Sequence, residues 1–152
     1  MDLYATHQRL LVKYMMETVG PVIELGAGNY STPILHEIAA AQGRHLTTID
    51  NNADWLNRFK NFEWERHSLK LLSSWDDFAV TESHGLAFVD HADPPSHPRW
   101  LQVLKLIPTT GVIVIHDTED DQYGYAKLID LIDVIDEDAT HKTHTRVIRR
   151  KQ

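Results

Sequence analysis

Aspartate and histidine side chains follow three short apolar runs of the sequence. Asp50 comes after residues 46–49, Asp90 after residues 86–89, and His116-Asp117 after residues 112–115. Carboxylates accept hydrogen bonds from hydroxyl groups and bind hard cations, and imidazole is a general base near neutral pH. Because ligands of parallel sheets bind at the carboxyl ends of the strands, we expect these side chains to gather around one ligand. Turn chemistry alone does not require acids at all of these positions.

A turn with two glycines, Gly26-Ala27-Gly28-Asn29, follows a fourth apolar run at residues 22–25. Glycines allow a tight turn with close backbone approach, and the helix expected to begin at Ser31 or Thr32 offers free N–H groups to an anion. Ser31 stands where the third glycine of a dinucleotide fingerprint would fall, and the Glu24 carboxylate would repel a pyrophosphate but attract an ammonium. These features disfavour NAD and favour a ligand with an amino acid group. An ordinary strand-to-helix turn is the alternative.

Asp50 has two possible roles. At the end of the strand that follows the glycine turn, its carboxylate can accept hydrogen bonds from both hydroxyls of a ribose. The alternative is that Asp50 caps a helix that begins at Ala53. The sequence leaves both open.

The elements that would position these residues alternate between short aliphatic runs and longer segments with helical spacing. Strands are predicted at residues 22–25, 46–49, 62–66, 86–89, 112–115 and 143–148, and helices from residue 3 to about 20, from 31 or 32 to 43, at 100–107 and at 123–134. Such alternation is typical of an α/β domain with a mostly parallel sheet between two layers of helices. The last strand is predicted to be antiparallel, at or near the sheet edge. The whole chain, residues 1–152, is predicted to form a single domain.

Composition excludes several classes of protein. The 152 residues carry a formal net charge of −7, which argues against tight nonspecific binding to nucleic acid or anionic lipid. The apolar runs are too short to cross a bilayer, so no membrane association is expected. The chain has no cysteine, which excludes disulfides, and its first residues lack a signal-peptide pattern. A cytoplasmic location is expected.

Taken together, the motifs resemble the core of class I S-adenosylmethionine-dependent methyltransferases over residues 20 to 118. The resemblance is carried by Glu24-x-Gly26-x-Gly28-x-x-Ser31-Thr32, Thr48-Ile49-Asp50, Phe88-Val89-Asp90 and Ile115-His116-Asp117. It implies a Rossmann-like, doubly wound sheet and S-adenosylmethionine as cofactor. The implied cofactor-binding set is Glu24, Gly26, Ala27, Gly28, Ser31, Thr32, Asp50, Asn51, Ser68 and Asp90. Within this set the first loop would cradle the methionine part, Asp50 the ribose, and Asn51 and Ser68 the adenine.

The second half of the motif set is similar to small-molecule O-methyltransferases of the catechol type. There, acids at the positions of Asp90 and Asp117 help to bind Mg²⁺, which acidifies the acceptor hydroxyl. This chain departs from that pattern, because Thr118 stands where an asparagine is usual and no lysine follows Asp90. Histidines are therefore the alternative bases, and the predicted catalytic set is His91, His116 and Asp90. A histidine that only bonds backbone at a strand end is the competing interpretation.

The acceptor is predicted to be a small molecule, with His97 and Arg99 as possible contacts and Trp75 and Trp100 as possible walls. Two other functions stay open. Asp93-Pro94-Pro95 resembles the signature of methyltransferases that modify base amino groups in nucleic acids, although Ser96 replaces the expected aromatic residue. The domain could instead bind the cofactor or a partner without catalysis. Because the chain is short, a homodimer could supply a missing wall of the acceptor pocket.

Overall fold

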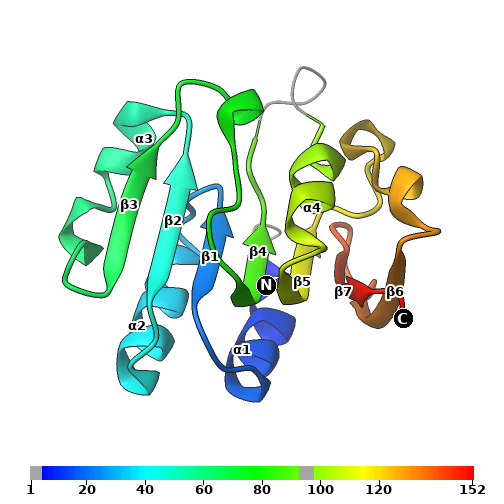
Figure 1. Ribbon diagram of the computed structural model, residues 1–152, viewed down its shortest axis with the longest axis horizontal. Coiled ribbons are helices and arrows are strands. Elements are labelled where there is room, and N and C mark those ends of the chain that lie inside the picture. The colour runs from blue at the N-terminus through cyan, green and yellow to red at the C-terminus, as the bar shows by residue number, and fades with distance from the viewer. Residues whose placement is uncertain (1–4, 93–97) are drawn as a thin grey trace.

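A computed structural model describes residues 5–92 and 98–152 of the chain (Figure 1). Its helices are α1 (Gln8–Glu17), α2 (Thr32–Gln42), α3 (Ala53–Asn57) and α4 (Trp100–Leu106). Its strands are β1 (Val22–Leu25), β2 (Leu46–Asp50), β3 (His67–Leu71), β4 (His84–Val89), β5 (Thr110–His116), β6 (Ile132–Asp138) and β7 (Thr145–Arg150). Short 3-10 turns at Lys60–Phe62, Trp75–Asp77, Asp121–Tyr123 and Tyr125–Leu128 complete the secondary structure of these residues.

The seven strands form one sheet in the order β3-β2-β1-β4-β5-β7-β6. Strands β1 to β5 are parallel, and β7 runs antiparallel to both β5 and β6. The predicted Rossmann-like, mostly parallel sheet is therefore confirmed, as is the antiparallel strand near its edge. Strand β6 occupies the edge itself. The order reverses between β1 and β4, which is where ligands bind in sheets of this kind.

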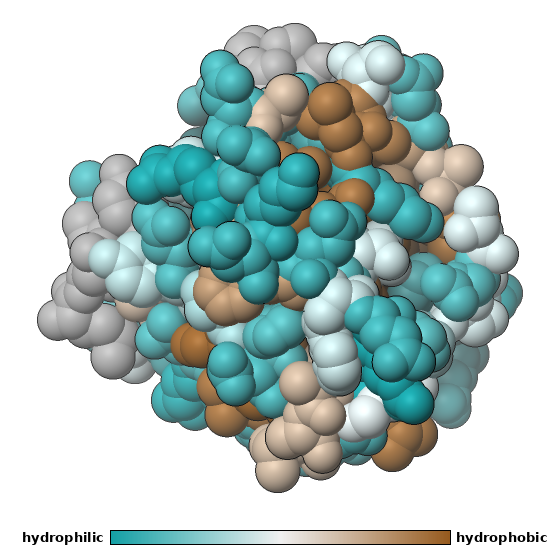
Figure 2. Space-filling view, turned by 90° about the vertical axis from the view of Figure 1, so that its left-hand side faces the viewer, coloured by the Kyte–Doolittle hydropathy of each residue, from teal (hydrophilic) through white to brown (hydrophobic). Residues whose placement is uncertain are grey.

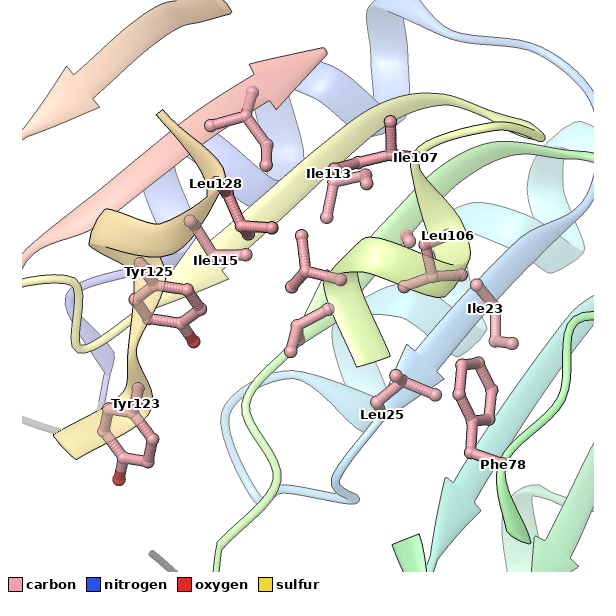
Figure 3. Close-up of a cluster of buried hydrophobic side chains, with 14 of the residues drawn as sticks. Ile23, Leu25, Phe78, Leu106, Ile107, Ile113, Ile115, Tyr123, Tyr125 and Leu128 are labelled. Carbon is pink, nitrogen blue, oxygen red and sulfur yellow. The ribbon is translucent and has the colours of Figure 1, made fainter. Parts of the chain in front are cut away.

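Helices cover both faces of the sheet, as predicted (Figure 1). On one face, α1 and α2 bury an apolar cluster that includes Leu11, Leu35 and Phe88. On the other face, α4 and the 3-10 turns pack over a cluster built on side chains such as Leu25, Leu106 and Ile115 (Figure 3). The alternation of strand side chains between the two faces directs Ile23 and Leu25 into one cluster and Glu24 into the opposite face.

Two predicted elements were wrong. Residues 62–66 are not a strand, because Phe62 ends a 3-10 turn and Trp64 and His67 exchange two backbone hydrogen bonds of 3.1 Å across a tight turn. Strand β3 begins only at His67. Ser68 therefore lies inside a strand, paired with Thr47, and does not follow one.

Residues 123–134 do not form one helix. Gly124 has a left-handed backbone, with φ of 73°, and separates two 3-10 turns. A β-carbon at this glycine would lie 2.4 Å from Trp100 Cδ1, so the chain approaches α4 more closely than a continuous helix would allow. Strand β6 then begins at Ile132 and pairs with β7. The helix prediction failed because the apolar residues of this segment belong partly to the buried 3-10 turns and partly to β6.

The described helices include none with the length and apolar character to span a membrane. The surface at the β3 end of the sheet is mainly hydrophilic, with hydrophobic side chains scattered in small groups (Figure 2).

Candidate active site

A cavity of about 1260 Å³ opens at the carboxyl ends of the parallel strands. Most of its lining comes from three regions: the glycine turn after β1, the segment after β2, and the ends of β4 and β5. The predicted site residues that line it are Gly26, Ala27, Gly28, Ser31, Asp50, Asn51, Asp90, His116 and Asp117. The structure therefore brings the ends of all four strands together, as the sequence predicted.

The glycine turn is held by close backbone contact. Gly26 has φ of 92°, and a β-carbon there would lie 2.5 Å from the backbone of His91, so only glycine lets the end of β1 approach the end of β4. Ser31 occupies the N-cap position of α2, although its side chain makes no capping hydrogen bond. Pro33 lies in the first turn of the helix, as predicted. Gly28 donates its N–H to Thr32 Oγ1 at 2.9 Å.

Glu24 lies beneath this turn and not at the cavity. Its carboxylate is fully buried and accepts hydrogen bonds from Ser31 at 2.6 Å, Thr32 at 2.9 Å and Thr48 at 2.7 Å. Burial raises the pKa of Glu24 to about 7, against the effect of these three hydroxyls. Neither Glu24 nor Thr32 lines the cavity. The predicted contact of Glu24 with a ligand ammonium is thus replaced by a contact that shapes the turn.

A chain of hydrogen bonds extends from Glu24 toward α2. Thr48 donates to Glu24, so the His67 Nε2 atom at 2.9 Å must donate to the Thr48 hydroxyl. His67 Nδ1 is then the acceptor for His36 Nδ1 at 3.0 Å. Burial, with the nearby His36 as a smaller cause, lowers the pKa of His67 to about 4. All donors in this chain point toward the carboxylate.

Asp50 connects the glycine turn after β1 with the segment after β2 at the cavity edge. It accepts the N–H of Ala27 at 3.0 Å and that of Asn52 at 2.9 Å. Burial raises the pKa of Asp50, although these N–H donors oppose the shift. Asn52, not Asp50, caps α3 through its side chain, which accepts the N–H of Trp55 at 3.0 Å. The capping alternative for Asp50 is therefore wrong.

The other end of the cavity is charged. Arg99, 2% exposed, approaches Asp90 and Asp117 at 3.2 Å each and donates to the backbone oxygens of His91 at 2.5 Å and His116 at 3.1 Å. Its guanidinium also lies 3.8 Å from the Tyr123 ring centroid. These contacts give Arg99 a structural role. Because Arg99 also lines the cavity, its predicted contact with an acceptor stays a prediction.

His116 joins the two acids of this end. Its Nδ1 lies 3.2 Å from Asp90 Oδ1 and 3.4 Å from Asp117 Oδ1, and its Nε2 lies 2.9 Å from Thr6 Oγ1. Burial opposes protonation of His116, but the Asp90 hydrogen bond and the charges of Asp90 and Asp117 together outweigh it and raise the histidine pKa. Burial likewise opposes ionisation of Asp90, yet His116 and Arg99 hold the pKa of that carboxyl below its usual range. Burial and the Asp90 charge raise the pKa of Asp117.

Asp117 reaches its position through a left-handed backbone, with φ of 55°. Aspartate tolerates this conformation better than most residues. The turn directs one carboxylate oxygen toward Arg99 and the other toward His116.

Several predicted residues lie elsewhere. The His91 ring is fully buried and packs on Trp75 with ring centroids 4.0 Å apart, so His91 does not face the cavity and its predicted role as base is wrong. Ser68 does not line the cavity either. Trp75 is a core residue, and Trp100 packs against the same cluster. Asp93-Pro94-Pro95 and His97 lie outside the described residues.

Sequence reasoning missed part of the lining. His7, Tyr30, Trp55, Tyr123, Lys142 and Thr143 all contribute to the cavity. His7 falls within the helix predicted from residue 3 to about 20, where a histidine near Leu3, Leu10 and Leu11 was a signal that the prediction did not use. Trp55 is positioned by its indole N–H, which donates to Ala27 O at 2.6 Å. This chain therefore supplies some of the wall for which a second copy was considered.

The predicted Mg²⁺ pair, Asp90 and Asp117, does not fit that ion. Arg99 bridges the two carboxylates, and His116 lies against both. A fixed guanidinium therefore lies between the two carboxylates, and residues 5–92 and 98–152 supply no set of oxygen ligands for an octahedral ion there. The cofactor end fits a nucleoside with an amino acid tail better, because backbone of the glycine turn and the Asp50 carboxylate border the same cavity.

Comparison with known proteins supports the fold. No protein-family model matches the chain, and no curated protein matches it. Among solved structures, an rRNA methylase from Streptococcus thermophilus shares 15% identity at a TM-score of 0.65, covering 95% of this chain and 97% of that one. A ribosomal protein L11 methylase from Lactobacillus delbrueckii subsp. bulgaricus shares 16% identity at a TM-score of 0.66, covering 96% of this chain and 79% of that one. The structure named StiE O-MT shares 12% identity at a TM-score of 0.62, covering 86% of this chain and 52% of that one.

These similarities, at 12–16% identity, define a class of fold: the three-layer α/β fold that these methylases share. Two of the names give different acceptors, rRNA and ribosomal protein L11, so the fold does not select an acceptor for this chain.

Proposed function

We propose that the protein is an S-adenosylmethionine-dependent methyltransferase that transfers the methyl group to a hydroxyl of a small molecule. The observation that carries the proposal is the composition of one cavity. The glycine turn and Asp50 border one end, and the Asp90–His116 pair borders the other. A cofactor site and a proton-accepting pair thus share a single space.

At the first end, backbone groups of the glycine turn would bind the amino acid part of the cofactor, and Asp50 would accept hydrogen bonds from the ribose hydroxyls. Asn51 and Trp55 border the same end and would contact the adenine. Glu24 positions the turn through its three hydroxyl partners. When bound, the sulfonium of the cofactor supplies an electrophilic methyl group.

At the second end, Asp90 and His116 would orient the acceptor. The Asp90 carboxylate is partly exposed to the cavity, and its contact with His116 Nδ1 offers the pair as the destination of the hydroxyl proton. Arg99 fixes both strand ends so that neither side chain moves away. A paired acid and histidine in this position favour catalysis over cofactor binding alone.

Size and charge favour a small acceptor. A cavity of about 1260 Å³ exceeds the roughly 300–1000 Å³ of a typical small-molecule site, which leaves space for two ligands. His7, Tyr123 and Thr143 surround the Asp90–His116 pair, so the pair is recessed. The net charge of −7 disfavours an RNA acceptor, although the fold similarity to an rRNA methylase makes RNA the acceptor to test against.

Thermal unfolding with S-adenosylhomocysteine tests the cofactor half. We expect the product analogue to raise the melting temperature and NAD to leave it unchanged. Asp50→Ala should abolish the response, whereas Asp130→Ala, at an exposed acid that does not line the cavity, should retain it. If wild-type protein shows no response to the analogue, the proposed function is wrong.

Methyl transfer from radiolabelled S-adenosylmethionine tests the acceptor half. A panel of catechols and other hydroxylated small molecules is compared with ribosomal RNA and ribosomal protein. We expect label in the small-molecule fraction and its loss in His116→Gln. Label only in RNA or protein would overturn the choice of acceptor and leave the cofactor assignment intact.

A further inference from the structure

Three side chains from distant parts of the sequence meet at the acceptor end of the cavity: His7, Asp90 and His116. Each offers one possible ligand atom, and these atoms lie within 4.8 Å of one another. His7 and His116 are 2% and 3% exposed, and all three residues line the cavity. The fold therefore builds a recessed group of two imidazoles and one carboxylate with access to the ligand space.

Surrounding contacts hold the two imidazoles in place. The His7 ring packs against Phe88 and edge-on against His116, with ring centroids 4.8 Å apart in both cases. His116 is fixed from behind by Thr6 Oγ1, 2.9 Å from its Nε2. Side chains fixed in this way lose little conformational freedom when they bind a ligand.

The two ring nitrogens of His7 have different surroundings. His7 Nε2 faces the Tyr30 carbonyl at 3.4 Å, and His7 Nδ1 is buried without a hydrogen-bond partner among the described residues. With the proton on Nε2, the buried Nδ1 carries a lone pair that a metal ion could accept. A histidine whose other nitrogen donates to a backbone carbonyl is a common form of metal ligand.

The separation of the other two atoms also suits an ion. His116 Nδ1 and Asp90 Oδ1 are 3.2 Å apart. Two atoms that each lie about 2.1 Å from one ion are separated by roughly 3–3.5 Å, so an ion could replace the proton that this pair shares. Two carboxylates, those of Asp90 and Asp117, lie at this end beside the guanidinium of Arg99, and carboxylates attract a cation.

We propose that His7, Asp90 and His116 form a binding site for a divalent transition metal such as Zn²⁺, Co²⁺ or Mn²⁺, with its open position toward the cavity. Two imidazoles and one carboxylate suit these ions, whereas Mg²⁺ and Ca²⁺ prefer oxygen ligands alone. The proposed ligand set differs from the predicted Mg²⁺ pair, because the two imidazoles of His7 and His116 take the place of Asp117. Asp90 belongs to both sets and keeps its contact with Arg99 at 3.2 Å.

An ion here would lower the pKa of a hydroxyl that enters the cavity. This role rests on the proposed function, since it needs a hydroxyl acceptor. Binding of the ion does not depend on the proposed function. The two claims therefore fail separately.

Metal titration of the full chain, after treatment with a chelator and its removal, tests the site. We expect one Zn²⁺ per chain by calorimetry, a visible absorption spectrum with Co²⁺ typical of four or five ligands including nitrogen, and no response to Mg²⁺. His7→Gln should weaken Zn²⁺ binding at least about 100-fold and remove the Co²⁺ bands. His45→Gln, at an exposed histidine, is the matched control and should bind as wild type.

Circular dichroism and the response to S-adenosylhomocysteine establish that each variant is folded. Absence of Co²⁺ bands in folded wild-type protein would overturn the site, as would wild-type affinity in His7→Gln. Either result alongside an intact S-adenosylhomocysteine response would reject the metal and leave the proposed function standing.

Discussion

The two ends of the cavity bury acids in opposite ways. At the glycine turn, Glu24 has three hydroxyl partners and no cationic partner among the described residues, and burial raises its pKa to about 7. At the other end, Asp90 contacts Arg99 and His116, which lower its pKa despite its burial. The first end is a nearly neutral frame for backbone groups, and the second keeps a negative charge available. This difference separates an end that positions a ligand from an end that can exchange protons or bind a cation.

Removal of Arg99 should have the largest effect, because it is the fixed cation of the charged end. Arg99→Met would leave Asp90 and Asp117 without their guanidinium and would also remove the contact with Tyr123. Loss of one partner from a buried ion pair costs about 3–5 kcal/mol of unfolding free energy. Urea unfolding at pH 7 measures this loss.

Two further variants identify its cause. Arg149→Met removes an exposed ion pair, with Asp133 at 3.9 Å, and should cost less than about 1 kcal/mol. Adding Asp90→Asn and Asp117→Asn to Arg99→Met should recover part of the stability, because no unpaired charge remains. If Arg99→Met costs no more than Arg149→Met, the charged end is not held by its cation.

The neutral end should respond to pH through His67. Its pKa is lowered from 6.5 to about 4 in the folded protein, so the folded state binds fewer protons than the unfolded state between these values. Stability from this group is present above pH 6.5 and is lost as the pH falls toward 4. The shift corresponds to about 3 kcal/mol, and His67→Gln should make the acid destabilisation shallower by about that amount. Urea unfolding at pH 7 and pH 4.5 gives the slope, with His45→Gln as the control that should match wild type.

Glu24 provides a check of opposite sign. Its pKa is raised from 4.5 to about 7, so the folded state binds more protons in this range and stability from Glu24 falls as the pH rises. Glu24→Gln removes that opposing slope, and its acid destabilisation should be steeper than that of wild type. Equal slopes in His67→Gln, Glu24→Gln and wild type would show that the chain from His67 to Glu24 does not titrate with folding.

Much of the arrangement was readable from the sequence because strand ends are local features. The runs before Asp50, Asp90 and His116 predicted the strands, and the parallel topology then placed the three side chains at one rim. The partners of these residues were not readable, since they depend on side-chain direction and on distant contacts. Glu24 faces the helix layer and not the cavity because strand residues alternate, and His91, the residue after Asp90, points into the core against Trp75. His7 reaches the site only through the packing of α1 on the sheet.

The glycine turn itself offers a more local test. Gly26→Ala would place a β-carbon 2.5 Å from the backbone of His91 at a left-handed position, with φ of 92°. We expect a loss of about 2–3 kcal/mol and no response to S-adenosylhomocysteine. Gly43→Ala is the matched control, because its φ of 65° is also left-handed but the nearest atom, at 3.4 Å, belongs to the flexible Arg66 side chain. It should cost about 1 kcal/mol and leave the ligand response intact, and an equal ligand loss in both variants would contradict the role of Gly26.

The smallest expected effect concerns the single contact between Trp55 and the glycine turn. Trp55→Phe keeps an aromatic ring beside Phe59 but removes the 2.6 Å hydrogen bond from the indole N–H to Ala27 O. A net hydrogen bond contributes about 1 kcal/mol, so stability should fall by about that much and S-adenosylhomocysteine should bind several-fold more weakly. Trp64→Phe is the control, at a half-exposed tryptophan that does not line the cavity. Zn²⁺ affinity should stay at its wild-type value in Trp55→Phe, because this contact belongs to the neutral end, and a parallel loss of both ligands would show that the two ends are not independent.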